Sequence, residues 1–272
     1  MKTITLVENT ANDKSLKPKH GLSVYIETPN HKILFDLGPD DALVHNANKL
    51  GVDLTEIDTV VISHGHFDHG GSLADFLKIN SKAKIYLHRL AFEPHYIKVL
   101  FAKINIGLDK KLAGNNRFTL TDDTARIDDE LFIFSDVEGT FSIKSNNVIL
   151  KKTANGYVKD DFAHEQNLVV TENDKVVLFS GCSHKGIENI LRAAQKHQPA
   201  IQAVFGGFHL INPATKSTEP PEVSQRLANE LSALGDVVFY TGHCTGLDAF
   251  EIMRKSMGEK LQQLYTGAMI VI

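Results

Sequence analysis

The chain has 272 residues, of which 42% are hydrophobic and 23% are charged. This composition is typical of a globular protein with a substantial core and argues against disorder. The formal net charge is −4, and Lys and Arg are scattered rather than gathered into a basic stripe, which argues against a nucleic-acid partner.

The N-terminal stretch has no apolar run long enough for a signal peptide or a membrane span, so we expect a cytoplasmic protein with no membrane partner. Two cysteines are present, Cys182 and Cys244. Each lies near a histidine, in GCSH and GHC, which favours a metal-binding or reactive role over a disulfide framework.

The first third of the chain reads as short strands followed by alternating helices and strands. Runs rich in Val, Ile, Leu and Tyr indicate the strands, and apolar residues at helical spacing indicate the helices. The expected strands are 3–7, 23–28, 32–35, 59–62 and 83–87, and the expected helices are 40–50 and 72–79.

Residues 89–129 are mixed and polar, with a helical piece expected at 94–102 and no clear strand. We interpret them as an insertion that covers a site. Since no linker or low-complexity stretch divides the chain, we expect one domain spanning residues 1–272. After residue 131 the alternation returns, with strands expected at 167–171, 176–179, 201–205, 237–240 and near 264, and helices at 186–196, 222–234 and 247–257.

The two halves of the chain show a weak internal similarity. KILFDLG, a helix and VVISHGH in the first half correspond to KVVLFSGC, a helix and AVFGGFH in the second. Two such halves would each form a mixed sheet, and the sheets would stack face to face with helices on both outer faces. This predicts an α/β protein with an αββα sandwich; chance similarity between the two units is the alternative.

Four candidate metal ligands follow the expected strand at 59–62, in the stretch SHGHFDHGG. They are His64, His66, Asp68 and His69. Neutral imidazole and carboxylate oxygen bind zinc, and also manganese or iron, and a turn at a strand end can direct alternate side chains toward two neighbouring ions. So dense a group of ligand-type side chains favours a metal site over a solvated polar loop.

This H-x-H-x-D-H run resembles the signature of the metallo-β-lactamase superfamily, and further matches follow along nearly the whole chain. The resemblance implies an αββα fold and a two-metal site. His64 and His66 would bind the first metal, and Asp68 and His69 the second. Asp36, in ILFDLG, would orient the metal-binding loop without being a ligand. The alternative for Asp36 is an ordinary cap of the helix that follows.

The segment DFAHEQNLVVTENDKVVLFSGC resembles the part of the superfamily in which a His precedes one strand and a Cys or Asp ends the next. It implies that His164 completes the first metal site and that Cys182 joins the second; the alternative for Cys182 is a small buried core residue. His184 competes with His164, and the sequence leaves that choice open. His243, in TGHCTG, matches the last histidine of the superfamily and would bind the second metal.

The stretches GCSHKG, GGFHL and HGLS resemble one branch of the superfamily, the dihydropterin-methyl-ribofuranosylaminobenzene-phosphate synthase-like proteins. By the internal similarity, His209 ends a strand as His64 does, so we expect it to face the site and contact substrate. His20 is expected to be an ordinary turn residue. Cys244 is expected to pack in the core, on the side opposite His243, if the backbone there is extended.

These residues predict a metallo-hydrolase with two divalent ions, zinc or alternatively iron or manganese, that activate water against an ester, thioester, lactam or phosphoester substrate. Asp68 would steer that water and accept its proton, and His209 would hydrogen-bond the substrate. The expected partner is a small molecule, and the sequence does not reveal the oligomeric state. Three alternatives stay open: a pterin-type transferase acting on a phosphorylated substrate, a phosphodiesterase or nuclease, and a metal-binding protein without catalysis.

Overall fold

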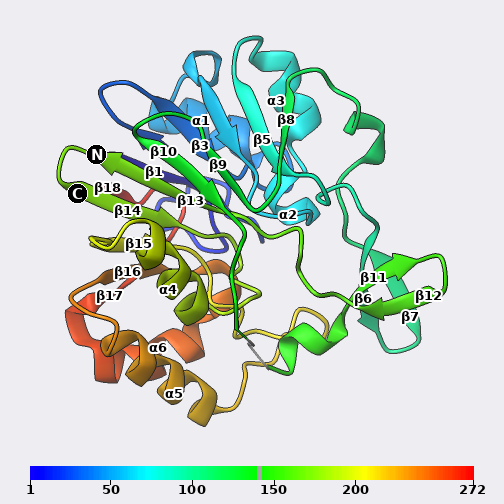
Figure 1. Cartoon of the computed structure of the whole chain (residues 1–272), viewed down its shortest axis with the longest axis vertical. Coiled ribbons are helices and arrows are strands. Elements are labelled where there is room, and N and C mark those ends of the chain that lie inside the picture. Colours follow the sequence, from blue (N-terminus) through cyan, green and yellow to red (C-terminus); the bar gives the residue numbers. More distant parts are fainter. Residues whose placement is uncertain (140–142) are drawn as a thin grey trace.

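Two seven-stranded mixed sheets lie face to face in the computed structural model, which describes residues 1–139 and 143–272 (Figure 1). In each sheet, antiparallel strands occupy one side and parallel strands the other. Helices cover both outer faces, which confirms the predicted αββα class.

The first sheet comes mostly from the first half of the chain. Its strands β1, β2 and β3 are antiparallel, and β4, β5 and β8 continue in parallel from β3. The strand order is β18 (Met269–Val271), β1 (Lys2–Val7), β2 (Ser23–Glu27), β3 (Lys32–Phe35), β4 (Thr59–Val61), β5 (Lys84–His88) and β8 (Phe118–Thr121).

The second sheet repeats this plan with residues from the second half. Strands β14 to β17 run parallel, and β13, β10 and β9 add antiparallel neighbours. The strand order is β17 (Leu261–Gln263), β16 (Val238–Thr241), β15 (Ala203–Phe205), β14 (Lys175–Phe179), β13 (Asn167–Glu172), β10 (Leu131–Phe134) and β9 (Thr124–Arg126).

The core forms three apolar layers, one between the sheets and one beneath the helices on each outer face. Along β14, Val177 and Phe179 pack between the sheets, whereas Val176 and Leu178 pack toward the helices. A strand buried on both faces reads as a continuous apolar run, here VVLF. The helices are α1 (Ala42–Leu50), α2 (Phe67–Gly70) and α3 (Leu73–Ile79) on the first-sheet side, and α4 (Ile187–His197), α5 (Pro221–Ser232) and α6 (Leu247–Met257) on the second.

A third, four-stranded antiparallel sheet projects from the side of the sandwich, at the right of Figure 1. It corrects the expectation of a helical piece at 94–102 and of no strand within 89–129. The segment there alternates buried and more exposed residues, because it pairs with a hairpin about fifty residues later in the chain. The strand order is β12 (Gly156–Lys159), β11 (Ile149–Thr153), β6 (His95–Val99) and β7 (Ala102–Asn105).

Most other predicted elements are present, with ends shifted by one or two residues. The short strand β18 was not predicted, and the strand expected near residue 264 ends at Gln263. Short 3-10 helices occupy Leu54–Glu56 (η1), Lys110–Leu112 (η2), Ser145–Val148 (η3), His243–Thr245 (η4) and Gly258–Lys260 (η5).

Parallel strands bring their carboxyl ends to one edge of a sheet, so the loops after β4, β14, β15 and β16 meet at one end of the sandwich. Direct backbone contact joins two of these loops, where the Gly207 amide donates to the Gly181 carbonyl (2.8 Å). None of the helices in the described ranges is long and apolar enough to cross a membrane.

Candidate metal centre

The turn after β4 carries the four predicted ligands of the first half into the space between the loops. His66 is the residue before α2, and Asp68 and His69 lie within that short helix. His64 and His69 are fully buried, and His66 and Asp68 are 4% and 9% exposed. Buried imidazoles seldom lack a partner, so each of their ring nitrogens should have a hydrogen-bond partner or a metal ion.

One group of donor atoms gathers around His69. Its Nε2 lies 3.2 Å from Cys182 Sγ, 3.3 Å from His243 Nε2 and 3.8 Å from Asp68 Oδ2. His243 Nε2 in turn lies 3.5 Å from Asp68 Oδ2. The structure thus brings together all four residues that the sequence assigned to the second metal.

A second group consists of His64, His66 and His184, whose candidate ligand atoms all lie within 4.8 Å of one another. Within the described residues, Nε2 of His64 and Nε2 of His184 are buried and have no hydrogen-bond partner. Buried imidazole nitrogens without a partner, in a group of three converging rings, are the arrangement that a cation would satisfy.

Hydrogen bonds fix which ring nitrogen faces the centre. Asp36 accepts from the Ser63 amide (2.7 Å), the Ser63 hydroxyl (2.7 Å) and Nδ1–H of His69 (2.6 Å). Because the Ser63 hydroxyl gives its proton to Asp36, it accepts from Nδ1–H of His64 (2.8 Å). Nε2 of His64 therefore keeps a lone pair for a metal, and Nε2 is the nitrogen of His69 that is left to bind one when its proton is displaced. Asp36 has the contacts expected of an orienting residue.

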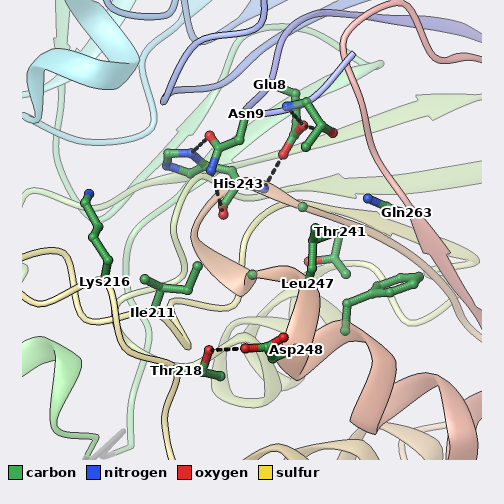
Figure 2. Close-up of a pocket in the computed structure, with 14 residues that line it drawn as sticks. Glu8, Asn9, Ile211, Lys216, Thr218, Thr241, His243, Leu247, Asp248 and Gln263 are labelled. Carbon is green, nitrogen blue, oxygen red and sulfur yellow. Dashed lines mark hydrogen bonds between the residues drawn. The ribbon is translucent and has the colours of Figure 1, made fainter. Parts of the chain in front are cut away.

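Two asparagines do the same for the histidines of the second half. Asn146 donates to the His184 carbonyl (2.9 Å), so its oxygen accepts from Nδ1–H of His184 (3.2 Å). Asn9 donates to the His243 carbonyl and accepts from Nδ1–H of His243, both at 3.0 Å (Figure 2). In all four imidazoles Nδ1 is hydrogen-bonded within the protein, so Nε2 is the nitrogen left to bind a metal.

Two buried glutamates hold the backbone of these histidines. Glu8 accepts the His243 amide (2.6 Å; Figure 2), and Glu165 accepts the amides of His184 (2.6 Å) and Lys185 (3.0 Å). Sequence reasoning missed both glutamates and both asparagines. The stretch HEQ contained a signal for Glu165, since a charged residue two positions before a buried strand needs a partner.

Burial and neighbouring charges set the protonation states. Burial holds the pKa values of His64, His66 and His184 well below normal, so these rings are neutral at pH 7. Burial alone would also lower the pKa of His69, but the carboxylates of Asp36 and Asp68 raise it to about 9.

The same competition acts on the other two donors of the His69 group. Burial raises the pKa of the Cys182 thiol. For Asp68, the effect of burial is outweighed by His69 and His243, which hold the pKa of the carboxyl well below its usual range.

His164 and His184 occupy different places. Nδ1 of His164 accepts the Gly65 amide (2.9 Å), so its proton sits on Nε2, 3.6 Å from Asp160. A protonated ring nitrogen has no lone pair for a metal. His184 has the ligand tautomer and lies with His64 and His66, so the geometry favours His184 at the position that the sequence left open.

The two groups fit divalent cations. Imidazole nitrogen, thiolate and carboxylate are all ligands that zinc takes, and a thiolate favours zinc over manganese. His64, His66 and His184 would hold one ion, and Asp68, His69, Cys182 and His243 the other.

A cavity of about 190 Å³ opens onto both groups. His209 lines it, its ring centroid 4.1 Å from that of His184, and both of its ring nitrogens are buried without a hydrogen-bond partner among the residues described. Lys216 and His243 line this cavity and also a neighbouring one of about 300 Å³ (Figure 2).

Two expectations about this cavity were wrong. His20 is not an ordinary turn residue, because its Nε2 lies 3.6 Å from Asp68 Oδ2 and the side chain lines the cavity. Cys244 does not point away from His243. The backbone there is the 3-10 helix η4 rather than extended, so Cys244 also reaches the cavity.

Comparisons with known proteins show which family the chain resembles. A profile of the metallo-beta-lactamase superfamily matches residues 16–147. The 7,8-dihydropterin-6-methyl-4-(beta-D-ribofuranosyl)-aminobenzene-5'-phosphate synthase of Methanocaldococcus jannaschii is 30% identical, over 99% of this chain and 96% of its own.

Solved structures share the fold. A metal-dependent hydrolase of the beta-lactamase superfamily has 26% identity and a TM-score of 0.83, covering 100% of this chain and 99% of that one. Zinc-bound PqqB from Methylobacterium extorquens has a TM-score of 0.58 at 11% identity, covering 100% of both chains, a likeness of fold alone.

Metal binding should release protons. At pH 7, zinc must displace one proton from His69 and one from the Cys182 thiol, so we expect release of about two protons per chain. Above pH 9 His69 is already neutral, and the release should fall toward about one. Calorimetric titration of the metal-free protein in buffers of different ionisation enthalpy measures this number. Release that is the same at pH 7 and pH 9.5 would contradict the assigned state of His69.

The choice between His184 and His164 can be measured directly. We expect His184→Ala to lower the metal content at saturation from about two ions per chain to about one, whereas His164→Ala keeps about two. Elemental analysis after equilibrium dialysis gives both numbers, and thermal unfolding of the metal-free variants checks their folding. The reverse pattern would place His164 in the centre.

Proposed function

The chain belongs to the metallo-β-lactamase superfamily, and on that premise we propose that it is a hydrolase that uses two divalent ions, zinc being the best fit to its donors. The observation that carries this proposal is the convergence of buried ring nitrogens, one thiol and one carboxylate into two adjoining groups beside a cavity. Such ions, when bound, would supply Lewis acidity that acidifies water and polarises a carbonyl or phosphoryl oxygen.

Asp68 is suited to handle the proton of the attacking water. It stays ionised in this setting, because His69 and His243 lower its pKa. Its carboxylate also faces His20, which lines the cavity. An anionic acceptor beside the attacking group can orient it and take its proton.

His209 is suited to hold the substrate. Its two ring nitrogens find no partner among the described residues, and the side chain lines the cavity next to His184. A ring in that position can donate a hydrogen bond to the oxygen on which negative charge develops. We therefore assign to His209 the role of a substrate-binding catalytic residue.

The cavity supports a small substrate with an apolar part and an anionic part. Ile97, Ile106 and Ile149 form one wall, and Lys216 lies where the two cavities meet. A phosphate or carboxylate group near Lys216 would be attracted by its ammonium. This favours a phosphoester over an uncharged ester or thioester.

A second candidate is group transfer. The relative from Methanocaldococcus jannaschii is named as a synthase, and its likeness extends over 99% of this chain. The larger cavity beside His243 gives a second substrate a place next to the first. In a transfer of this kind an amine would replace water, its nitrogen would bond to the carbon that loses the phosphorylated leaving group, and Asp68 would take the proton.

Activity assays test the proposal. The metal-free protein, reloaded in turn with zinc, manganese and iron(II), is assayed with p-nitrophenyl phosphate, bis-p-nitrophenyl phosphate, p-nitrophenyl acetate and nitrocefin. We expect phosphoester hydrolysis that needs metal and is lost on chelation. Loaded protein that turns over none of these, but joins a phosphorylated pterin to an aminobenzene ribose phosphate by mass spectrometry, would favour the transferase. Loaded protein inactive in every assay would contradict both.

His209 can be separated from the metal sites. We expect His209→Ala to lower kcat about a hundredfold while both ions stay bound, because it removes a substrate contact and no ligand. The control is His45→Ala. His45 lies on helix α1, where its ring hydrogen-bonds to the Ser15 carbonyl, so this variant should keep full activity. Steady-state kinetics and elemental analysis give the two readouts. A His209→Ala protein that loses an ion would make His209 a ligand instead.

A further inference from the structure

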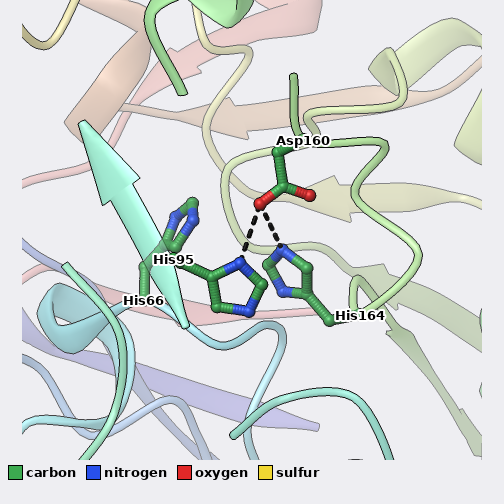
Figure 3. A group of neighbouring side chains, drawn as sticks. All are labelled: His66, His95, Asp160 and His164. Atoms are coloured by element: carbon green, nitrogen blue, oxygen red, sulfur yellow. Dashed lines mark hydrogen bonds and ion pairs between the residues drawn. The ribbon is translucent and has the colours of Figure 1, made fainter. Parts of the chain in front are cut away.

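A second cluster of buried titratable side chains lies beside His66, outside the two proposed metal groups. It consists of His95, Asp160 and His164, which are 0%, 5% and 2% exposed. Candidate ligand atoms of these residues and of His66 all lie within 4.8 Å of one another (Figure 3). Nothing in the proposed mechanism uses this cluster.

The small sheet delivers two of these residues. His95 is the first residue of β6, and Asp160 directly follows β12. Backbone hydrogen bonds tie the sheet to the metal-binding turn, from the Ile106 amide to the His95 carbonyl (3.0 Å) and from the Phe67 amide to the Ile106 carbonyl (2.8 Å). The side chains of β6 and the residue after β12 therefore have a fixed position relative to His66.

Hydrogen bonds determine where the protons lie. Asp160 Oδ1 accepts the Phe162 amide (2.8 Å), and Oδ2 accepts Nδ1–H of His95 (2.7 Å; Figure 3). In the neutral His95 ring, Nε2 is therefore an unprotonated acceptor. That nitrogen is buried, and within residues 1–139 and 143–272 it has no hydrogen-bond partner.

His66 offers the matching donor. Its Nε2 is also buried without a partner in the described part of the chain. A single hydrogen bond would satisfy both nitrogens, whereas leaving both unpaired in a dry interior is costly. The two rings meet edge to face, at 77° with centroids 5.6 Å apart, and candidate ligand atoms of the two residues lie within 4.8 Å of one another.

We propose that Asp160 and His95 position His66 for metal binding: Nε2–H of His66 donates to Nε2 of His95, whose Nδ1–H donates to Asp160. This leaves Nδ1 of His66 as its metal-binding atom. His66 thus takes the opposite tautomer to His64, His69, His184 and His243. The carboxylate strengthens His95 as an acceptor, and so makes His66 a better electron donor to the ion.

A third cation in this cluster is the rival explanation, and the protons argue against it. His164 Nε2 carries a proton, because Nδ1 accepts the Gly65 amide. His66 is already engaged with the first ion. Only His95 and Asp160 would remain as ligands in the described structure, fewer than zinc takes in protein sites. His164 instead packs against the ring of His95, with centroids 3.9 Å apart.

Asp160→Asn is the decisive variant. Its oxygen must still accept the Phe162 amide, so the NH2 group faces His95 and forces the proton of that ring onto Nε2. Nε2–H of His95 then faces Nε2–H of His66, and two donors cannot form a hydrogen bond with each other. We expect zinc to bind the first site roughly 10- to 100-fold more weakly, with about two ions still bound at saturation. Competition with a chromophoric chelator measures the affinity, and elemental analysis the number.

The matched control is Asp161→Asn, the same change at the next residue. Asp161 is exposed and pairs with Lys151 on the surface, so this variant should bind zinc as the unaltered protein does. This inference rests on the metal centre proposed above. If the unaltered protein binds no zinc, the metal centre and the inference both fail. If Asp160→Asn binds zinc as tightly as Asp161→Asn, the inference alone fails, and if it loses a third ion, the cluster is a cation site.

Two further measurements guard against a folding defect in Asp160→Asn. His95→Leu should weaken zinc binding, and His95→Gln should restore part of it, because an amide oxygen can accept from His66 where a methyl group cannot. Nitrogen-15 chemical shifts of the unaltered, metal-free protein report ring tautomers directly. They should show His95 protonated on Nδ1 and His164 on Nε2, and the opposite assignment for His95 would overturn the proposal.

Discussion

The rest of this structure depends on a set of imidazole nitrogens buried where the described protein gives them no hydrogen-bond donor. Nε2 of His64 and Nε2 of His184 each lack a partner among the described residues. Each such group costs about 1–3 kcal/mol when no partner is supplied. A fold that tolerated these costs for packing alone would be weaker than one with apolar residues at the same positions. This cost supports the proposal that the arrangement is a cation site.

Three buried carboxylates support that site, and they do so in two different ways. Asp36 fixes the tautomer of His69, whereas Glu8 and Glu165 accept backbone amides and so place the loops that carry His243 and His184. The loops also store strain. Asp36, Ser183, His209 and His243 all have φ between 50° and 60°, a conformation that costs non-glycine residues about 1–3 kcal/mol each. The surrounding hydrogen bonds over-determine these positions and offset that cost.

The sequence predicted what is local and missed what is decided by distant contacts. His64, His66, Asp68 and His69 lie within six residues, so their chemistry was legible in one motif. The preference for His184 over His164 could not be predicted in this way. It depends on a hydrogen bond from the Gly65 amide to His164, two residues that are 99 positions apart in the chain. Asn9 and Asn146 could not be predicted for the same reason, since nothing in the sequence around an isolated asparagine shows that the fold places it beside a histidine.

The small sheet was the largest error in the fold, and it also links substrate to metal. Its strands β6 and β11 pair residues about fifty positions apart in the chain. The local sequence of either strand therefore does not show that it forms a strand rather than a helix. One sheet then does two things: Ile97 and Ile149 line the cavity, while His95 and Asp160 lie beside His66. Ile97 and His95 both belong to β6, two residues apart on the same face of the strand. The strand that forms part of the apolar wall of the cavity therefore also carries the ring that lies beside His66.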